Sequence, residues 1–341
     1  MKQAERIKAG AIQLNVLDAG RRDGLPLLFL HGFPDFHYGW RKQVPVFEDR
    51  GYRIIAPDQR GYNLSDKPKG IAAYNLDLLG QDLINLLDTL KLDKVCVIGH
   101  DWGGATAWWL AHHHPERVKG LIVLNMPHPE VFKKHLRASR TQKRKSWYML
   151  FFQLPGLPEW ALGRAKFMHF GQSLKAGARR GAFTQQDLEK YVKAWSEPGA
   201  FTAMLNWYRA ALRAPAKPFP STAVKPPVLL IWGSKDAFLE EAMAQPSLER
   251  CQQGRMVRLP HAGHWVQQDD PEQVNDLIQE FLDFLEGKRS DYAPKPELTR
   301  SKPLPADDEP LKAPRKRKED DIVDLTDDEM EAWKKRSREK S

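Results

Sequence analysis

The chain has 341 residues, of which 41% are hydrophobic and 10% aromatic, and it carries a formal net charge of +9. This supply of bulky apolar side chains supports a large core, and it excludes a chain that is disordered throughout. The two cysteines, Cys96 and Cys251, are too few for a disulfide scaffold and fit a reducing compartment. No apolar run approaches the roughly 20 residues of a bilayer-spanning helix, and residues 1–14 lack the apolar middle of a signal peptide. We therefore expect a cytoplasmic protein without a membrane span.

Short apolar segments rich in β-branched residues recur along the first third of the chain and again after residue 226. Nearly continuous apolar runs of this length are typical of parallel strands that are buried on both faces. Amphipathic segments at 76–90 and 102–113 lie between them and predict helices. The alternation predicts an α/β fold with a mostly parallel sheet flanked by helices. The predicted strands are Leu25–Leu30, Arg53–Ala56, Val95–Ile98, Gly120–Leu124, Pro227–Trp232 and Arg255–Leu259.

The strand–helix alternation stops near residue 126 and resumes at residue 227. Residues 126–226 show helical patterns and many aromatic side chains, so we expect a helical cap inserted into a core formed by 1–125 and 227–287. A cap at this point would cover the carboxyl edge of the sheet, where α/β proteins bind their ligands. Residues 126–226 also hold 18 Lys and Arg against 5 Asp and Glu. A solvated basic face is the simpler interpretation of this charge, and attraction of anionic substrates or surfaces is the alternative.

Residues 288–341 form a charged, proline-rich tail that we predict to be disordered or tethered. The basic cluster Arg315–Lys318 resembles a nuclear-localisation signal, which gives nuclear location as an alternative. The segment Asp321–Glu329 resembles a SUMO-interacting motif, an apolar string beside acids that can add a strand to a partner's sheet. A solvated tail is the simpler interpretation, and Thr326 with Glu329 instead predicts the capping box of a helix. A non-catalytic scaffold that acts through this tail is one alternative for the function.

The segment Gly99–Gly104 is the most informative part of the sequence. A predicted strand runs into Gly-x-Asp-x-Gly and then into a helix, the pattern of a nucleophile elbow with Asp101 in place of serine. The flanking glycines have a steric reason, because a sharp strand-to-helix turn crowds the backbone. The turn would place Asp101 at a helix N-terminus, where the dipole and free N–H groups favour a carboxylate. Asp101 is predicted to be an ionised nucleophile, and simple capping of the helix is the alternative.

Two further groups follow Asp101 in the chain order that such an elbow requires, first an acid and then a histidine. Asp236 follows a predicted strand, and His264 lies 28 residues further on. Such a histidine is oriented by an acid through one ring nitrogen and acts as a base through the other. The loop at 31–34 also follows an early strand. It predicts an oxyanion hole formed by the backbone N–H groups of Phe33 and Trp102.

Together these segments resemble a soluble-type epoxide hydrolase of the α/β-hydrolase fold, over roughly residues 5 to 287. The matching core segments are His31–Pro34, Asp58–Tyr62, Gly99–Gly104, Gly233–Asp236 and Gly263–Trp265. Two strings in the predicted cap, at 148–155 and 205–209, are more diagnostic. The resemblance implies that Tyr148 and Tyr208 bind the epoxide oxygen, although packing is the simpler role for aromatic residues in a helical cap. Phe33, Trp102, Phe152 and Trp207 are the expected substrate-binding residues.

The implied reaction begins with attack of Asp101 on a saturated epoxide carbon, which opens the ring and leaves an alkyl ester on the enzyme. Water activated by His264, with Asp236 holding the imidazole, would then release a vicinal diol. The rival within the fold is a haloalkane or haloacid dehalogenase. Haloalkane dehalogenases usually carry Asn where this chain has Phe33, and fluoroacetate dehalogenases carry Arg where it has Trp102. Both departures disfavour dehalogenation.

The expected partners are an apolar epoxide and water, with no nucleic acid for the core. The histidine run His112–His114 closes a predicted helix before a proline and offers no second cluster of ligands. We therefore predict neither a metal nor a cofactor.

Overall fold

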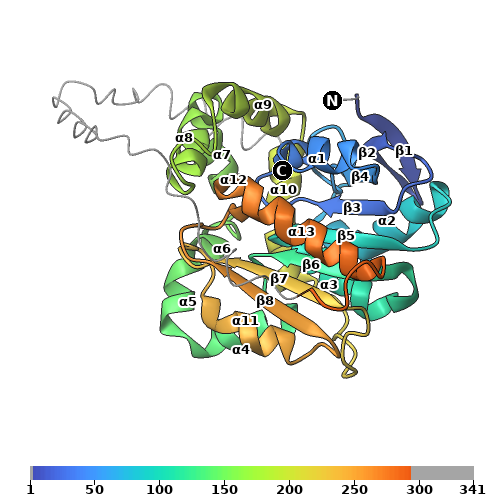
Figure 1. Ribbon diagram of the computed structural model, residues 1–341. Helices are drawn as coiled ribbons and strands as arrows, with labels where there is room; N and C mark the ends of the chain where they lie inside the picture. The colour runs from blue at the N-terminus through green and yellow to red at the C-terminus, as the bar shows by residue number, and fades with distance from the viewer. Residues whose placement is uncertain (1–2, 293–341) are drawn as a thin grey trace, which may run out of the picture. The chain divides into compact units, whose positions relative to one another are not determined.

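The computed structural model describes residues 3–292, apart from the side chains of residues 165 and 166. An eight-stranded sheet runs through it in the order β1-β2-β4-β3-β5-β6-β7-β8 (Figure 1). The pairs β1–β2 and β2–β4 are antiparallel, and the others are parallel. The strands are β1 (Glu5–Ala9), β2 (Ile12–Gly20), β3 (Pro26–Leu30), β4 (Arg53–Pro57), β5 (Val95–His100), β6 (Val118–Leu124), β7 (Val228–Gly233) and β8 (Gly254–Leu259).

All six predicted strands are present, and they are β3 to β8. The sequence analysis missed the antiparallel hairpin of β1 and β2, whose register pairs Ala9 with Ile12. Its turn includes Gly10, with a φ of +68° that favours glycine. Most of β1 is exposed or half-buried, so its sequence has no continuous apolar run to mark it.

Helices cover both faces of the sheet. Along β5, Val95 and Val97 join the core that contains α2 and α3, whereas Cys96 and Ile98 join the core that contains α1 and α13. This alternation explains why the strand sequence is apolar throughout. The helices around the sheet are α1 (Val44–Asp49), α2 (Leu76–Thr89), α3 (Trp102–His113), α11 (Ala244–Leu248), α12 (Val266–Asp269) and α13 (Pro271–Leu285).

The segment between the neighbouring strands β6 and β7 is helical, and its aromatic residues share a buried cluster with Phe36, Tyr62 and Trp265 of the sheet domain. Buried hydrogen bonds attach it to the sheet domain: the indole of Trp207 donates to the carbonyl of Arg60 at 3.0 Å, and that of Trp195 donates to Pro34 at 2.6 Å. The predicted α/β fold with an inserted helical cap is thus confirmed. Its helices are α4 (Pro129–Ala138), α5 (Arg140–Lys145), α6 (Trp147–Phe151), α7 (Leu157–Gly163), α8 (Met168–Ala176), α9 (Gln185–Ser196) and α10 (Ala200–Arg213).

None of the helices within residues 3–292 combines the length and apolar character needed to cross a bilayer. The predictions made for the end of the chain, including Arg315–Lys318 and Asp321–Glu329, lie outside the described residues.

Helix α3 approaches the sheet so closely that two glycines have no room for a side chain. A Cβ on Gly103 would lie 2.1 Å from the carbonyl oxygen of Leu30 in β3. A Cβ on Gly99 would lie 2.4 Å from the carbonyl oxygen of Gly103. The obstacles are backbone atoms, which cannot rotate away, so the crowding expected for the turn is present.

We expect Gly103→Ala to lower the free energy of unfolding by about 1–3 kcal/mol, because the added methyl group must push α3 away from β3. Urea unfolding measures this. Gly163→Ala is the matched control, since its new Cβ would meet Phe167 at an ordinary 3.7 Å. Equal losses in the two variants would contradict the steric argument.

Candidate active site

Asp101 lies on the turn between β5 and α3 and adopts a φ of +50°. This conformation is uncommon for a residue other than glycine and is concentrated at functional sites. The backbone N–H of Phe33 donates to Asp101 Oδ1 at 2.9 Å. Gly32 permits this approach, because a Cβ there would lie 2.4 Å from the Asp101 Cβ. One carboxylate oxygen is therefore fixed by the 31–34 loop.

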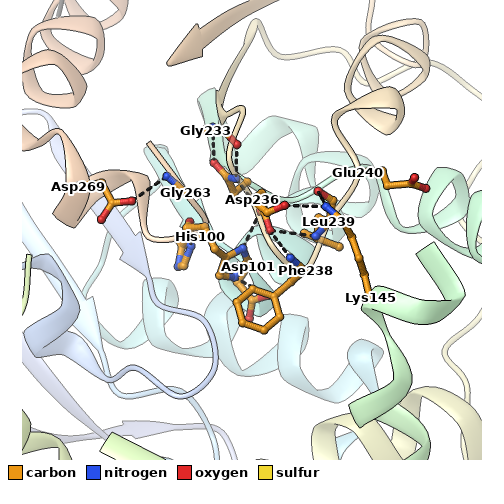
Figure 2. A network of polar contacts seen from close by, with 12 residues as sticks. His100, Asp101, Lys145, Gly233, Asp236, Phe238, Leu239, Glu240, Gly263 and Asp269 are labelled. Carbon is orange, nitrogen blue, oxygen red and sulfur yellow. Dashed lines mark hydrogen bonds and ion pairs between the residues drawn. The ribbon is translucent and has the colours of Figure 1, made fainter. Parts of the chain in front are cut away.

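His264 lies between two carboxylates from distant parts of the chain. They belong to Asp101 and Asp236, which Figure 2 labels. The Nε2 of His264 is 3.5 Å from Asp101 Oδ2, and its Nδ1 is 2.8 Å from Asp236 Oδ2. The other oxygen of Asp236 accepts the N–H groups of Phe238 and Leu239, at 2.7 and 2.9 Å. The structure thus brings together the three residues that the sequence analysis predicted. The histidine lies between the predicted nucleophile and the predicted acid, as in a hydrolase triad.

Asn125 also holds the acid, and the sequence analysis missed it. Its side-chain amide donates to Asp236 Oδ2 at 2.6 Å, and its Oδ1 accepts the N–H of Gly233 at 2.8 Å. Asn125 directly follows β6, which neighbours β7 in the sheet. A polar residue at the carboxyl end of an apolar strand is the signal that would have indicated it.

The charges of the three groups depend on one another. Burial favours the neutral form of Asp101, but the hydrogen bond and charge of His264 outweigh it and lower the pKa of this carboxyl below its usual value. The pKa of Asp236 is lowered in the same way. Burial alone would lower the pKa of His264, whereas the two carboxylates raise it to about 10. At neutral pH the site therefore holds two carboxylates around an imidazolium.

Two further buried groups lie behind His264, and neither was predicted. His100 Nε2 is 2.8 Å from the carbonyl oxygen of His264, and its Nδ1 lies 3.9 Å from Asp35 Oδ2. Burial lowers the pKa of His100 to about 4, so its ring is neutral at pH 7. Burial raises the pKa of Asp35 to about 6, and the hydroxyl of Tyr191 donates to this carboxylate.

The cap contributes two tyrosines to the same region, Tyr148 from α6 and Tyr208 from α10. Their ring centroids are 5.9 Å apart, and the ring of Tyr208 lies 5.1 Å from that of Trp102. The side-chain amide of Gln153 joins the two helices, because it donates to the carbonyls of Met149 and Tyr208, each at 3.1 Å. Burial raises the pKa of both tyrosines, so their hydroxyls stay protonated at neutral pH.

Aromatic rings surround these tyrosines. The rings of Phe33 and Phe152 lie 5.2 and 5.1 Å from that of Tyr208. The ring centroid of Trp207 lies 5.7 Å from that of Trp102, and the Trp207 side chain is only 1% exposed. Phe238 was not predicted, yet its ring lies 5.1 Å from His264 and 5.8 Å from Tyr148. The substrate-binding roles of the four predicted aromatics remain predictions, although the structure places Phe33, Trp102 and Phe152 against the ring of Tyr208.

Two other predictions concern the backbone N–H of Trp102 and the histidine run His112–His114. The N–H of Trp102 makes no hydrogen bond to Asp101 within residues 3–292, so its place in the oxyanion hole stays a prediction. His112, from the histidine run, contacts another ring instead, with its Nε2 2.8 Å from Nε2 of His128.

Comparisons with known proteins identify the family of the chain. The family model of the α/β hydrolase fold matches residues 26–271. The AB hydrolase superfamily protein YfhM of Bacillus subtilis is 44% identical over 81% of this chain and 96% of its own length. Human epoxide hydrolase 4 is 40% identical over 81% of this chain and 77% of its own length. An inhibitor complex of Bacillus megaterium epoxide hydrolase matches with a TM-score of 0.76 and 31% identity, over 82% of this chain and 100% of that one. The chain therefore belongs to the α/β-hydrolase fold family and, within it, to the epoxide hydrolases.

Proposed function

We propose that the protein converts an apolar epoxide into a vicinal diol through a covalent ester on Asp101. The observation that carries the proposal is the environment of this carboxylate. One oxygen accepts the Phe33 N–H, while the other lies 3.5 Å from His264 Nε2, and the rings of Tyr148 and Tyr208 lie in the same aromatic cluster. The epoxide hydrolases among the relatives support the substrate class.

The first step opens the epoxide ring. Asp101 Oδ2, which the Phe33 N–H does not hold, attacks a ring carbon, and the carbon–oxygen bond of the ring breaks. Tyr148 or Tyr208 gives its hydroxyl proton to the departing oxygen, since both are protonated at neutral pH. A positioned acid of this kind contributes about 10² to 10⁴ in rate. The result is an alkyl ester on Asp101.

The second step cleaves that ester with water. Nε2 of His264 takes a proton from the water, whose oxygen then attacks the carboxyl carbon of Asp101. Negative charge develops on Oδ1, where the Phe33 N–H already donates, and such a donor is worth about 10² to 10³ in rate. The diol leaves with the original Oδ2, and the oxygen of the water stays in the regenerated carboxylate.

Ester formation also converts His264 into a base. In the resting site its pKa is about 10, so the ring is protonated. Esterification removes the negative charge of Asp101, which is one of the two charges that stabilise the imidazolium, and the pKa of His264 falls. The released proton restores the tyrosine hydroxyl. Of the two protons of the attacking water, one leaves with the diol and the other protonates His264, which restores the resting imidazolium.

We also propose 126–226 as the cap and 1–125 with 227–287 as the core. The support is that all helices from α4 to α10, with both tyrosines, belong to the first range. For a cytoplasmic location the support is the two free cysteines, Cys96 and Cys251, which a reducing compartment keeps as thiols.

Asp101→Asn and His264→Gln are each expected to lower diol formation at least about 10⁴-fold, because each removes a group that acts in a covalent step. Chromatographic detection of the diol measures this, and Asp93→Asn, at an exposed position, is the control.

In ¹⁸O-labelled water, with wild-type enzyme in excess over substrate, the first turnover should place the label in the peptide that contains Asp101. Label found solely in the diol would overturn the proposed ester.

The double variant Tyr148→Phe/Tyr208→Phe should slow ring opening by about 10² to 10⁴ while it still binds the substrate, since the aromatic rings remain. Single-turnover kinetics report the first effect, and tryptophan fluorescence quenching reports the second. Tyr292→Phe serves as the control, because that hydroxyl bonds to the carbonyl of Val228 in the sheet. Unchanged ring opening in the double variant would rule out acid catalysis by the tyrosines.

Asp101→Asn should lower the pKa of His264, because a neutral amide, like the ester, no longer stabilises the imidazolium. NMR titration of ¹⁵N-labelled histidine measures the shift against a starting value of about 10. His112 is the internal control, since burial lowers its pKa to about 4 and the charge of Asp101 is not among the causes of that shift. An unaltered pKa of His264 would show that esterification cannot produce the base.

A further inference from the structure

One face of the cap exposes large apolar side chains beside cations that form no ion pair with any of the described residues. Trp147 and Leu150 on α6 are 64% and 70% exposed, and Leu154, just beyond the helix, is 44% exposed. Contiguous apolar groups on the surface of a folded domain mark an interaction site more often than isolated ones do. The exposure of these three side chains therefore indicates a surface that binds a partner.

Helices α5 and α6 form one nearly continuous helical segment. Across their junction the N–H of Ser146 donates to the carbonyl of Gln142 at 2.8 Å, and the N–H of Met149 donates to that of Ser146 at 3.0 Å. Helical spacing of three and four residues places one set of side chains on a single side. We call this set the α5–α6 face, and it consists of Arg140, Lys143, Arg144, Trp147, Leu150 and Leu154, all of them exposed.

The α5–α6 face carries three cations. Arg140, Lys143 and Arg144 make no ion pair with any of residues 3–292. The neighbouring helix α4 adds three exposed cations, Lys133, Lys134 and Arg137, which likewise form no ion pair with residues 3–292. On α7, another helix of the cap, Trp160 is 52% exposed, and the guanidinium of Arg164 lies 4.7 Å from the centre of its ring.

We propose that the α5–α6 face binds the surface of an anionic lipid bilayer. Exposed Trp and Leu beside Lys and Arg are the combination that inserts into the headgroup region while its cations pair with anionic lipids. A second copy of the same face is disfavoured, because its cations would repel. An acidic soluble protein would satisfy Lys143 and Arg144, but it gives no reason for Trp147 and Leu150 to be exposed beside them.

Surface binding of this kind needs no membrane-spanning helix, and it leaves the other side of the segment in its place. Tyr148 is half-buried between Trp147 and Met149, and its ring packs on Phe152 and Phe238. A bilayer bound at the α5–α6 face would therefore lie on the side of α6 opposite the aromatic cluster.

The test is sedimentation of the full chain with vesicles of phosphatidylcholine alone or mixed with phosphatidylserine. We expect binding to the mixed vesicles that weakens as salt is added, because salt screens the attraction. Equal sedimentation with both kinds of vesicle, or with neither, would overturn the proposal.

Variants separate the two ends of the face. Each cation near an anionic bilayer contributes about 1 kcal/mol, so Lys143→Gln/Arg144→Gln should weaken binding roughly 30-fold. Trp147→Ser/Leu150→Ser should weaken it at least about tenfold through the loss of apolar insertion. The matched controls are Lys69→Gln/Lys94→Gln and Leu78→Ser. They alter exposed residues of the α/β domain outside the cap and should bind like wild type.

Thermal unfolding checks that each variant is folded, and no step of the test depends on epoxide hydrolysis. Binding that survives both substitutions of the α5–α6 face would overturn the proposal. So would a dimer in analytical ultracentrifugation that Trp147→Ser/Leu150→Ser dissociates, because the occupant would then be a second copy. Binding of acidic polypeptides that requires Lys143 and Arg144 but not Trp147, without vesicle binding, would identify a protein partner instead.

Discussion

Two buried carboxylates close to one another are stable only if other groups compensate their charge, and this requirement explains most of the site. Asp101 and Asp236 share the imidazolium of His264 between them. The remaining oxygens accept backbone N–H groups from Phe33, Phe238 and Leu239. Without such partners each buried charge would cost several kcal/mol. The loops that supply the donors are therefore part of the electrostatic balance of the resting enzyme as well as of the proposed reaction.

The sheet makes this compensation feasible, because its parallel strands end at one edge. The loop with Phe33, the nucleophile elbow, Asn125 and the acid loop follow β3, β5, β6 and β7, which are consecutive neighbours in the sheet (Figure 1). The cap is attached to the same edge through buried Gln142, which accepts the N–H of Glu240 at 2.9 Å and donates to the carbonyl of Phe238 at 2.8 Å. Lys145 donates to the carbonyl of Asp236 at 2.6 Å (Figure 2). These bonds couple the position of Tyr148, a few residues further along, to that of the acid.

The sequence allowed prediction where one short segment determines both the conformation and the chemistry. The elbow at Asp101 is such a segment, because glycine spacing, turn and nucleophile lie within a few residues, and the order of Asp236 and His264 completes it. His100 and Gln142 could not be predicted in this way, because their roles arise from contacts with segments more than 90 residues away. The hairpin of β1 and β2 was missed because its strands are not continuously apolar.

The α5–α6 face shows a different limit of sequence analysis. The spacing of Trp147, Leu150 and Leu154 in the sequence is that of a core-facing helical surface, and periodicity alone does not distinguish the inside from the outside. In the structure the buried side chains of this segment include Gln142 and Ser146 instead, because Gln142 binds the acid loop and donates to Ser146. A polar requirement on the inner side thus places the apolar stripe outside.

The two parts of the chain differ in the sign of their net charge, and this difference bears on how the protein would approach an anionic surface. Residues 1–125 and 227–287 hold 25 Asp and Glu against 20 Lys and Arg, whereas residues 126–226 hold 5 against 18. An anionic surface would repel the first set and attract the second, so it would orient the protein with the cap towards it before any side chain inserted. Because neighbouring residues on a helix point about 100° apart, Tyr148 packs on Phe152 and Tyr208, while Trp147 would make the proposed contact with lipid. One short helix is enough for both tasks, since the first depends on its inner side and the second on its outer side.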